Sequence, residues 1–465
     1  MRATLPAKRK ASYRMILLVL MFLFTCEFIV RGPLRFLSQG SEFNDFVSPL
    51  VQSRIFVGGN DPYDPFELIR FWPKETQPPT FLRKDVQEGT AVSKDGVPSP
   101  YPPTCFALLS PISVLPWHFA KLLCLTTNCI CVLILIYLLL SLSRLRAASS
   151  RAYLFVALTL GFAPLHTALA SGNLILPVCA AGVGAIWCSN RRYATAAGAL
   201  LVIATCLKPP VGIVFLVHNM LRRRWRESMV GIGLSGIIAG ATALRMWFGH
   251  VNWIGSYSKN IHDMFALGAI NDFTTLNPLR FHLLNLQMLA YLLSDNRRLA
   301  MIGSWLVVLG LLAWLMTVKR HEHETELLEL SALATIALLP VYHRFTDGIL
   351  LILPLCWAIA TDDHQLQKIT RVVLLLLLPF LLPGASLLHT LAKYQGAIDR
   401  LASSWWWQRI VVPHEVWAIL AISVVLLFAL HLKTTSTVQA IIDPSAGAVD
   451  RLRWRNSRMA ETTNR

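Results

Sequence analysis

The run MILLVLMFLFTCEFIV, residues 15–30, decides the class of fold. A helix of this length and apolar composition is stable across a lipid bilayer. Basic residues precede the run, as in a signal peptide, but no small-residue cleavage site follows and residues 31–33 read Arg-Gly-Pro. We therefore interpret the run as a retained membrane anchor.

The composition of the whole chain agrees with this interpretation. Of its 465 residues, 54% are hydrophobic and 15% are charged, and the mean hydropathy is +0.51. Apolar runs recur along the chain, and no stretch has the composition of a soluble domain. We predict an all-α polytopic membrane protein with one integral membrane domain over residues 1–432 and a basic cytoplasmic tail over residues 433–465.

Charge patterning predicts how the chain crosses the membrane. Short loops on one side are basic at nearly every turn, whereas short loops on the other side hold only Lys208 and Arg344. The positive-inside rule assigns the basic loops to the cytoplasm, which explains the net charge of +17 without a nucleic-acid partner. The pattern predicts about twelve spans with both termini in the cytoplasm. The predicted spans are residues 15–30, 118–143, 153–170, 174–188, 193–207, 211–221, 228–248, 301–317, 326–342, 348–360, 372–388 and 417–432.

This topology leaves long external loops over residues 31–117, 249–298 and 389–416, in which we expect amphipathic helices. Several predicted spans are shorter than a lone membrane-crossing helix, so they would have to lie inside a bundle. The nine cysteines lie mostly in apolar runs without metal or redox spacing, which predicts that they are packing residues.

The first external loop contains the stretch SEFNDFVSPLVQSRIFVGGNDPYDP, residues 41–65, in which Asp45 opens an amphipathic helix. The apolar face of this helix would hold Asp45 at the bilayer surface. A carboxylate in a partly apolar setting can take a proton from a hydroxyl, so Asp45 is a candidate general base. The alternative is that Asp45 caps the N-terminus of the helix.

The end of this stretch, residues 58–65, is a turn by its chemistry, because Gly, Asn, Asp and Pro favour turn conformations. Asp61 and Tyr63 are candidates for substrate contact, and a structural role within the turn is the alternative. Two aspartates without a supporting His or further carboxylate do not predict a metal site.

Lys208 lies at an external helix end, before Pro209-Pro210, against the positive-inside trend. A cation at this depth is costly, so Lys208 is a candidate site residue with an anionic partner such as a lipid phosphate. The alternative is that it extends to ordinary lipid headgroups. Asn173, in another external turn, could contact sugar hydroxyls or simply follow a helix-ending glycine.

His343, Arg344 and Asp347 form a further charged external turn between apolar runs. Arg344 can bind a phosphate, and His343 can donate a proton or a hydrogen bond to a leaving phosphate oxygen. The alternative is a self-contained turn in which Arg344 pairs with Asp347.

Other stretches carry weaker signals. The His- and Glu-rich residues 321–326 suggest metal binding, but their cytoplasmic, alternating pattern predicts a solvated loop. Residues 405–407, Trp-Trp-Trp, are typical of an interfacial aromatic belt. No phosphate-binding loop, dinucleotide-binding glycine pattern or Ser-His-Asp arrangement is found.

The order of these motifs resembles glycosyltransferase family 87 over most of residues 15–360. An acidic residue follows the first span, and then come a Gly-Asn-Asp-Pro-Tyr-Asp turn and a Tyr-Pro-Pro-Thr sequence that leads to residues 108–116. Gly172-Asn173 and Lys208-Pro209-Pro210 come next, before the basic residues 222–226.

The resemblance implies a GT-C-type bundle that transfers a hexose from a polyprenyl-phosphate donor to a hydroxyl of a lipid-linked or glycan acceptor. It implies inversion at the external face of the plasma membrane, with Asp45 as general base and no cofactor or obligatory metal. We expect the charges of Lys208, His343 and Arg344 to stabilise the leaving phosphate. The remaining residues expected at the substrate site are Asp61, Tyr63, Tyr101, Asn173 and Asp347.

The chain departs from the family pattern in two places. Asn173 stands where family members often carry Gln, and residues 340–344 replace a stretch that contains Ser-Trp. These departures leave the donor sugar open between mannose, which is the default, and arabinose, glucose or galactose.

Two other classes of function compete with the enzyme. A transporter or flippase for a lipid-linked substrate would place ionisable residues in mid-span and show internal repeats, whereas the charges here lie at the external ends and no repeat is found. A membrane scaffold would leave Lys208 and the 343–347 turn without a purpose.

Overall fold

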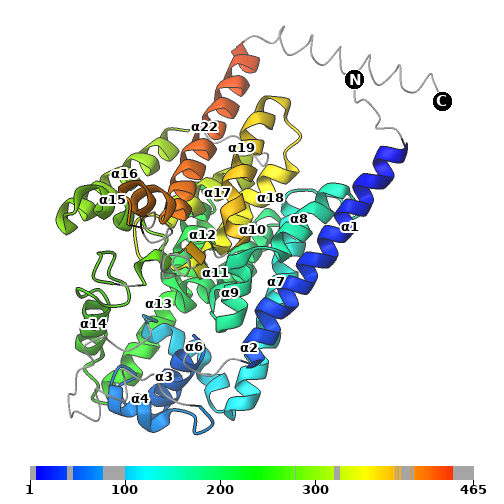
Figure 1. Cartoon of the computed structure of the whole chain (residues 1–465). Helices are drawn as coiled ribbons and strands as arrows, with labels where there is room; N and C mark the ends of the chain where they lie inside the picture. The colour runs from blue at the N-terminus through cyan, green and yellow to red at the C-terminus, as the bar shows by residue number, and fades with distance from the viewer. Residues whose placement is uncertain are drawn as a thin grey trace.

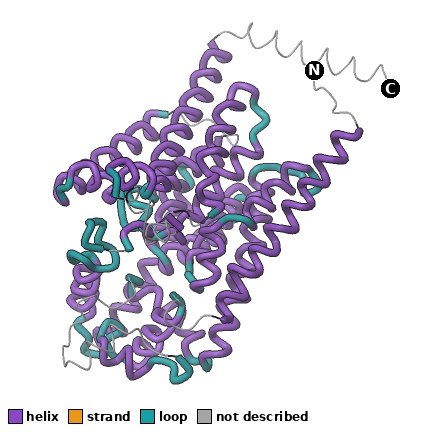
Figure 2. The backbone as a smooth tube through the Cα atoms, viewed as in Figure 1, coloured by secondary structure: helices purple, strands orange, loops and turns teal. Residues whose placement is uncertain are grey.

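The computed structural model of the chain describes residues 7–38, 45–76, 100–277, 279–318, 325–382 and 403–442, together with residues 384, 387, 388 and 400 (Figure 1). Helices form nearly all the regular structure of these residues (Figure 2). An antiparallel bridge between Leu283 and Arg344 is the one pairing of extended segments described. The prediction of an all-α membrane protein is confirmed.

Five described helices are long and apolar enough to cross a membrane, or up to six if a bent pair counts as one span. The pair consists of α8 (Ser150–Leu160) and α9 (Ala163–Ser171), which meet at 48°. The five are Met15–Ser38, which contains most of α1 (Ala7–Ile29), η1 (Val30–Leu34) and α2 (Arg35–Ser38); α7 (Trp117–Leu142); α13 (Trp225–Phe248); α16 (Arg297–Thr317); and His414–Thr434 of α22 (His414–Ile442).

Each of the other predicted spans also overlaps a helix. These helices are shorter than a lone membrane-crossing helix, so the predicted count of about twelve spans is not confirmed. Burial explains how such short helices persist, because nearly all residues of α10 and α17 are covered by neighbouring helices. The shorter helices are α10 (Ile175–Asn190), α11 (Ala194–Leu207), α12 (Pro209–Leu221), α17 (Glu326–Ala337), η5 (Phe345–Leu351), α18 (Ile352–Ala360), η6 (His364–Leu366), α19 (Gln367–Leu377) and η7 (Leu378–Leu381).

The end of the molecule opposite the start of α1 and the end of α22 is built from the first predicted external loop (Figure 1). It contains α3 (Val47–Gly58), α4 (Pro65–Phe71) and α6 (Pro103–Ser113). Arg54 of α3 donates to the carbonyl oxygens of Ser113 and Leu115, at 2.9 and 2.7 Å, and satisfies the end of α6. Arg245 of α13 does the same for α3 by donating to the Val57 carbonyl at 2.6 Å.

The second predicted external loop contains α14 (Trp253–Met264), at the edge of the molecule in Figure 1, followed by η3 (Arg280–His282) and α15 (Leu286–Ser294). Of the third predicted loop, residues 403–416 are described. They include η8 (Trp407–Val411), before which Trp405 and Trp406 are exposed. The helix α22 continues to Ile442, beyond the predicted end of the membrane domain, and residues 443–465 lie outside the described residues.

Buried ion pairs join the end of α12 and the start of α13 to α17. Arg222 lies 2.8 Å from Glu329, and Arg224 lies 2.6 Å from Glu326. The prediction that Glu326 belongs to a solvated loop is therefore wrong, because a glutamate with this partner can be buried in α17. Residues 321–324 of that predicted loop lie outside the described residues.

Candidate active site

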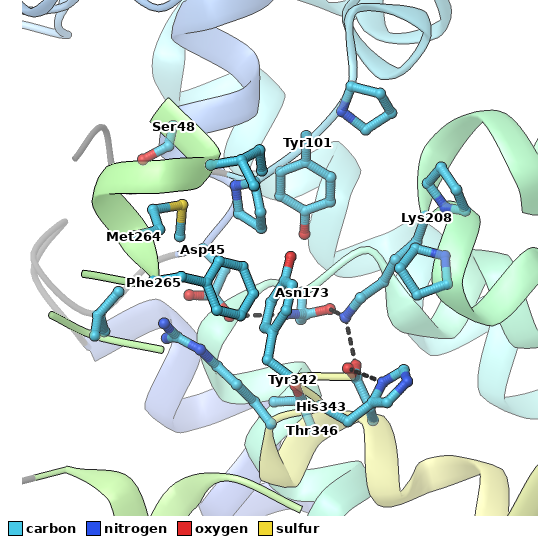
Figure 3. Close-up of a pocket in the computed structure, with 18 of the residues that line it drawn as sticks. Asp45, Ser48, Tyr101, Asn173, Lys208, Met264, Phe265, Tyr342, His343 and Thr346 are labelled. Atoms are coloured by element: carbon cyan, nitrogen blue, oxygen red, sulfur yellow. Dashed lines mark hydrogen bonds and ion pairs between the residues drawn. The ribbon is translucent and has the colours of Figure 1, made fainter. Parts of the chain in front are cut away.

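Polar side chains from distant parts of the chain meet in a cavity of about 480 Å³ (Figure 3). The site residues predicted from the sequence that line it are Asp45, Tyr101, Asn173, Lys208, His343, Arg344 and Asp347. The other side chains that line it are Ser48, Trp72, Pro100, Pro102, Pro209, Pro210, Tyr257, Ile261, Met264, Phe265, Ile270, Tyr342 and Thr346.

The C-terminal end of α9 fixes Asp45. The Asp45 N–H donates to the Ser171 carbonyl at 2.6 Å, and the Asn173 amide donates to Asp45 Oδ2 at 2.9 Å. Gly172 makes this possible, since its φ of 68° ends α9 and turns the chain so that Asn173 faces Asp45. The interpretation of Asp45 as a helix cap is wrong, because α3 begins at Val47 without a side-chain cap.

Lys208 lies at the junction of α11 and α12. Pro209 disfavours helical backbone at the residue before it, and Lys208 accordingly leaves the helix with φ −147° and ψ 83°. Its amine pairs with Asp347 and lies 3.5 Å from Asn173 Oδ1. With its side chain 16% exposed and directed into the cavity (Figure 3), Lys208 does not extend to lipid headgroups.

The 343–347 turn brings an Asp-His pair to the same place. His343 Nδ1 lies 2.9 Å from Asp347 Oδ2, while the other oxygen of Asp347 pairs with Lys208. Arg344 donates to Asn271 Oδ1 at 3.2 Å. The interpretation of a turn in which Arg344 pairs with Asp347 is therefore wrong.

These contacts form one continuous path of polar groups. It runs from Asp45 through Asn173 to Lys208, and on through Asp347 to His343 (Figure 3). A carboxylate thus lies at one end of the path and cationic or protonatable groups lie at the other. The amide of Asn173 separates the two.

Some polar atoms of residues that line the cavity have no partner among the described residues. They are His343 Nε2, Thr346 Oγ1 and Trp72 Nε1, all of them buried. Buried polar atoms in proteins are nearly always hydrogen-bonded, so each of these groups can still make a hydrogen bond, although its atom has almost no accessible surface in this structure. His343 Nε2 is the most informative, because Asp347 already fixes the opposite nitrogen of its ring.

Tyr101 is buried beside Asp45. Burial raises the pKa of its hydroxyl well above the ordinary value, and the neighbouring charge of Asp45 adds to this effect. Tyr101 therefore stays protonated near neutral pH and can donate a hydrogen bond but cannot act as a base.

Asp61 and Tyr63, predicted to contact substrate, lie behind this cavity and do not line it. Asp61 accepts hydrogen bonds from the Tyr63 N–H, at 3.0 Å, and from the Ser256 hydroxyl. Tyr63 donates its hydroxyl to the Tyr101 carbonyl at 2.8 Å. The turn predicted for this stretch is confirmed, and Asp64 within it caps α4 by accepting from the Phe66 N–H at 2.9 Å.

Aromatic residues that sequence reasoning missed separate the cavity from an apolar groove of about 490 Å³. Phe265 and Tyr342 line both spaces and make an edge-to-face pair with ring centres 4.9 Å apart. The groove runs between α12, α16 and α17, and apart from Gln287 and Tyr342 its side chains are apolar. Of the two aromatic residues, Tyr342 had a signal in the sequence, because it stands next to His343.

Within the described part of the chain, no group of three or more His, Cys, Asp or Glu side chains comes together as metal ligands would. The expectation that transfer needs no metal or cofactor stays a prediction.

Comparison with known proteins identifies the family. The sequence model of glycosyltransferase family 87 matches residues 100–341, a little over half of the chain. No curated protein and no solved structure that matches the chain was found. The matched residues include Asn173 and Lys208, and the match ends immediately before Tyr342. The chain therefore belongs to glycosyltransferase family 87 and is a membrane glycosyltransferase.

Proposed function

We propose that the protein transfers a hexose, mannose by default, from a polyprenyl-phosphate donor to a hydroxyl of a lipid-linked or glycan acceptor. The reaction would take place at the external face of the plasma membrane. The observation that carries this proposal is one cavity lined by the Asp45 carboxylate and by the cations Lys208 and Arg344, next to an apolar groove with which it shares Pro210, Phe265 and Tyr342.

Asp45 would act as the general base. Its Oδ2 accepts from Asn173, which orients the carboxylate, and it lines the cavity. In the proposed step the acceptor hydroxyl gives its proton to Asp45 while its oxygen bonds to the anomeric carbon of the donor. The bond from that carbon to the phosphate oxygen breaks at the same time, so the configuration inverts.

Lys208, Arg344 and His343 would stabilise the leaving polyprenyl phosphate. A lysine amine and an arginine guanidinium both bind phosphate oxygens, and a buried imidazole nitrogen can donate one further hydrogen bond. Asp347 holds both Lys208 and His343, so these two groups face the cavity in fixed positions. Such preorganised charge is worth most where it meets the negative charge that develops during transfer.

The apolar groove would take the polyprenyl chain. It meets the cavity at Pro210, Phe265 and Tyr342, on the side where Lys208 precedes Pro209-Pro210. A donor whose phosphate contacts Lys208 would then extend its tail between α12 and α16. This arrangement supports a lipid-linked donor over a soluble nucleotide sugar, whose second half is polar.

A donor panel tests the proposal. Purified protein in lipid is given radiolabelled polyprenyl-phosphate mannose, glucose, galactose or arabinose, or a nucleotide sugar, together with a lipid extract as acceptor. We expect label to move to acceptor from one polyprenyl-phosphate sugar and not from the nucleotide sugar. Transfer from the nucleotide sugar alone would overturn the donor class, and movement of intact donor across the bilayer without transfer would instead support a flippase.

Filling the groove should weaken binding of long-chain donors selectively. Ala337 lines the groove, so Ala337→Phe takes space from the polyprenyl tail. Because each buried CH₂ contributes about 0.8 kcal/mol, we expect the KM for a long-chain donor to rise about tenfold or more. A donor with one isoprene unit should be nearly unaffected.

The matched control for the groove is Ala239→Phe on the exposed face of α13. This change adds the same volume outside the groove. Equal effects of Ala337→Phe on long-chain and short-chain donors, or equal effects of the two variants, would contradict a tail in the groove.

A further inference from the structure

We infer that Asp61 is a positioning residue for the transfer reaction, which acts through Ser256 on the helix α14 that closes one side of the cavity. This inference deepens the proposed function and rests on it for its kinetic test. It assigns Asp61 a role different from the substrate contact expected from the sequence.

One face of α14 lines the cavity. Tyr257, Ile261 and Met264 follow one another at helical spacing and all line it. The opposite face carries Gly255, Lys259 and His262, all exposed, and is open to the surroundings. The position of α14 thus decides whether this side of the cavity is closed.

The C-terminal end of α14 is held from the bundle side. Arg297, at the start of α16, donates to the Phe265 carbonyl at 2.7 Å. The Asn271 N–H donates to the Met264 carbonyl at 3.1 Å. These bonds fix the end of α14 that lies next to the aromatic pair of Phe265 and Tyr342.

The N-terminal half of α14 is joined instead to the first external loop, by way of Asp61 and Tyr63. The Ser256 hydroxyl donates to Asp61 Oδ2, and the ring of Tyr257 lies 5.3 Å from that of Tyr63. Tyr63 in turn donates to the carbonyl of Tyr101, which lines the cavity. The turn that contains Asp61 and Tyr63 therefore connects two sides of the cavity, namely α14 and Tyr101.

The environment of Asp61 fits a carboxylate used for its hydrogen bonds. Burial raises the pKa of Asp61, and the hydrogen bonds from Ser256 and the Tyr63 N–H lower it. Both carboxylate oxygens are occupied by protein donors, and Asp61 does not line the cavity. A carboxylate placed in this way holds protein segments together and does not meet substrate.

The test compares two substitutions of the same residue. Asn at position 61 can accept from the Tyr63 N–H and donate to the Ser256 hydroxyl, so Asp61→Asn keeps both bonds without the charge. Asp61→Ala loses both, and Ser256→Ala loses the bond to α14. We expect Asp61→Ala and Ser256→Ala to lower kcat/KM about tenfold, the typical loss for a hydrogen bond to a charged group, and Asp61→Asn to remain near wild type.

A double variant checks that the residues act together. If Asp61 acts through Ser256, the Asp61→Ala/Ser256→Ala variant should be little worse than either single variant. Asp64→Asn is the matched control, because Asn also caps helices well and the side chain of Asp64 bonds within its own turn, to the Phe66 N–H. Loss of transfer in Asp61→Asn equal to that in Asp61→Ala would overturn the inference and return Asp61 to substrate contact.

Hydrogen exchange gives a readout that does not depend on transfer. We expect amides of α14 to exchange about tenfold faster in Asp61→Ala and Ser256→Ala than in wild type, with α7 and α10 unchanged. Unchanged exchange in α14 would refute the positioning role even if no donor sugar supported transfer. Faster exchange without any transfer by wild type would uphold the contact and refute the proposed function instead.

Discussion

Asp45→Asn is expected to lower kcat for sugar transfer by a factor of about 10² to 10⁴, the range for loss of a general base. The carboxamide oxygen can still accept from Asn173, and the Asp45 N–H still reaches the Ser171 carbonyl. The variant should therefore fold normally and bind the donor with a nearly unchanged KM. Radiolabel transfer over a range of donor concentrations gives kcat and KM, and the thermal unfolding midpoint in detergent checks that the variant folds.

The matched control is again Asp64→Asn, in the same predicted external loop but outside the cavity. It should keep at least half of the wild-type rate. If Asp45→Asn retained more than a tenth of that rate, another group would have to accept the proton.

Lys208→Met is expected to reduce both catalysis and stability. Removing the charge takes a preorganised group from the leaving phosphate, which should lower kcat about 10²- to 10³-fold. It also leaves Asp347, whose side chain is 4% exposed, without its lysine partner. Breaking a buried ion pair in this way costs about 3–5 kcal/mol, so the thermal midpoint should fall clearly.

A double variant separates these two effects. In Lys208→Met/Asp347→Asn both charges are absent, so most of the lost stability should return. Transfer should stay low, because the phosphate still lacks its lysine. Recovery of transfer along with stability would mean that Lys208 serves only to balance Asp347.

Hydropathy located the helices well, but it did not determine how many cross the membrane. Each predicted span overlaps a helix because apolar runs favour helices in lipid and in a bundle core alike. Whether a short helix such as α10 is covered by neighbours depends on tertiary packing. The positive-inside rule counts charges in loops, so it could not indicate the partners of Arg222 and Arg224. These partners, Glu326 and Glu329, lie far along the chain.

The sequence indicated several residues of the candidate site but few of their partners. Lys208 stood out because its charge opposed the topology, and it does line the cavity. Its pairing with Asp347 depends on how η5 packs against the junction of α11 and α12, which no local pattern encodes. Asp61 was predicted to contact substrate but does not line the cavity. A motif gives the order of residues and not the direction in which their side chains point. Tyr257 gave no signal, since an aromatic on an amphipathic helix is common.

The anomeric configuration of the product distinguishes a single from a double displacement, and the proposed mechanism is a single displacement with Asp45 and the phosphate-binding cations on opposite sides of the sugar. A polyprenyl-phosphate hexose of known configuration is used as donor, and the configuration of the new glycosidic bond is determined by NMR. We expect inversion. Retention of configuration would contradict it, because Asp45 would then have to act as a nucleophile or the acceptor would have to approach from the side of the phosphate.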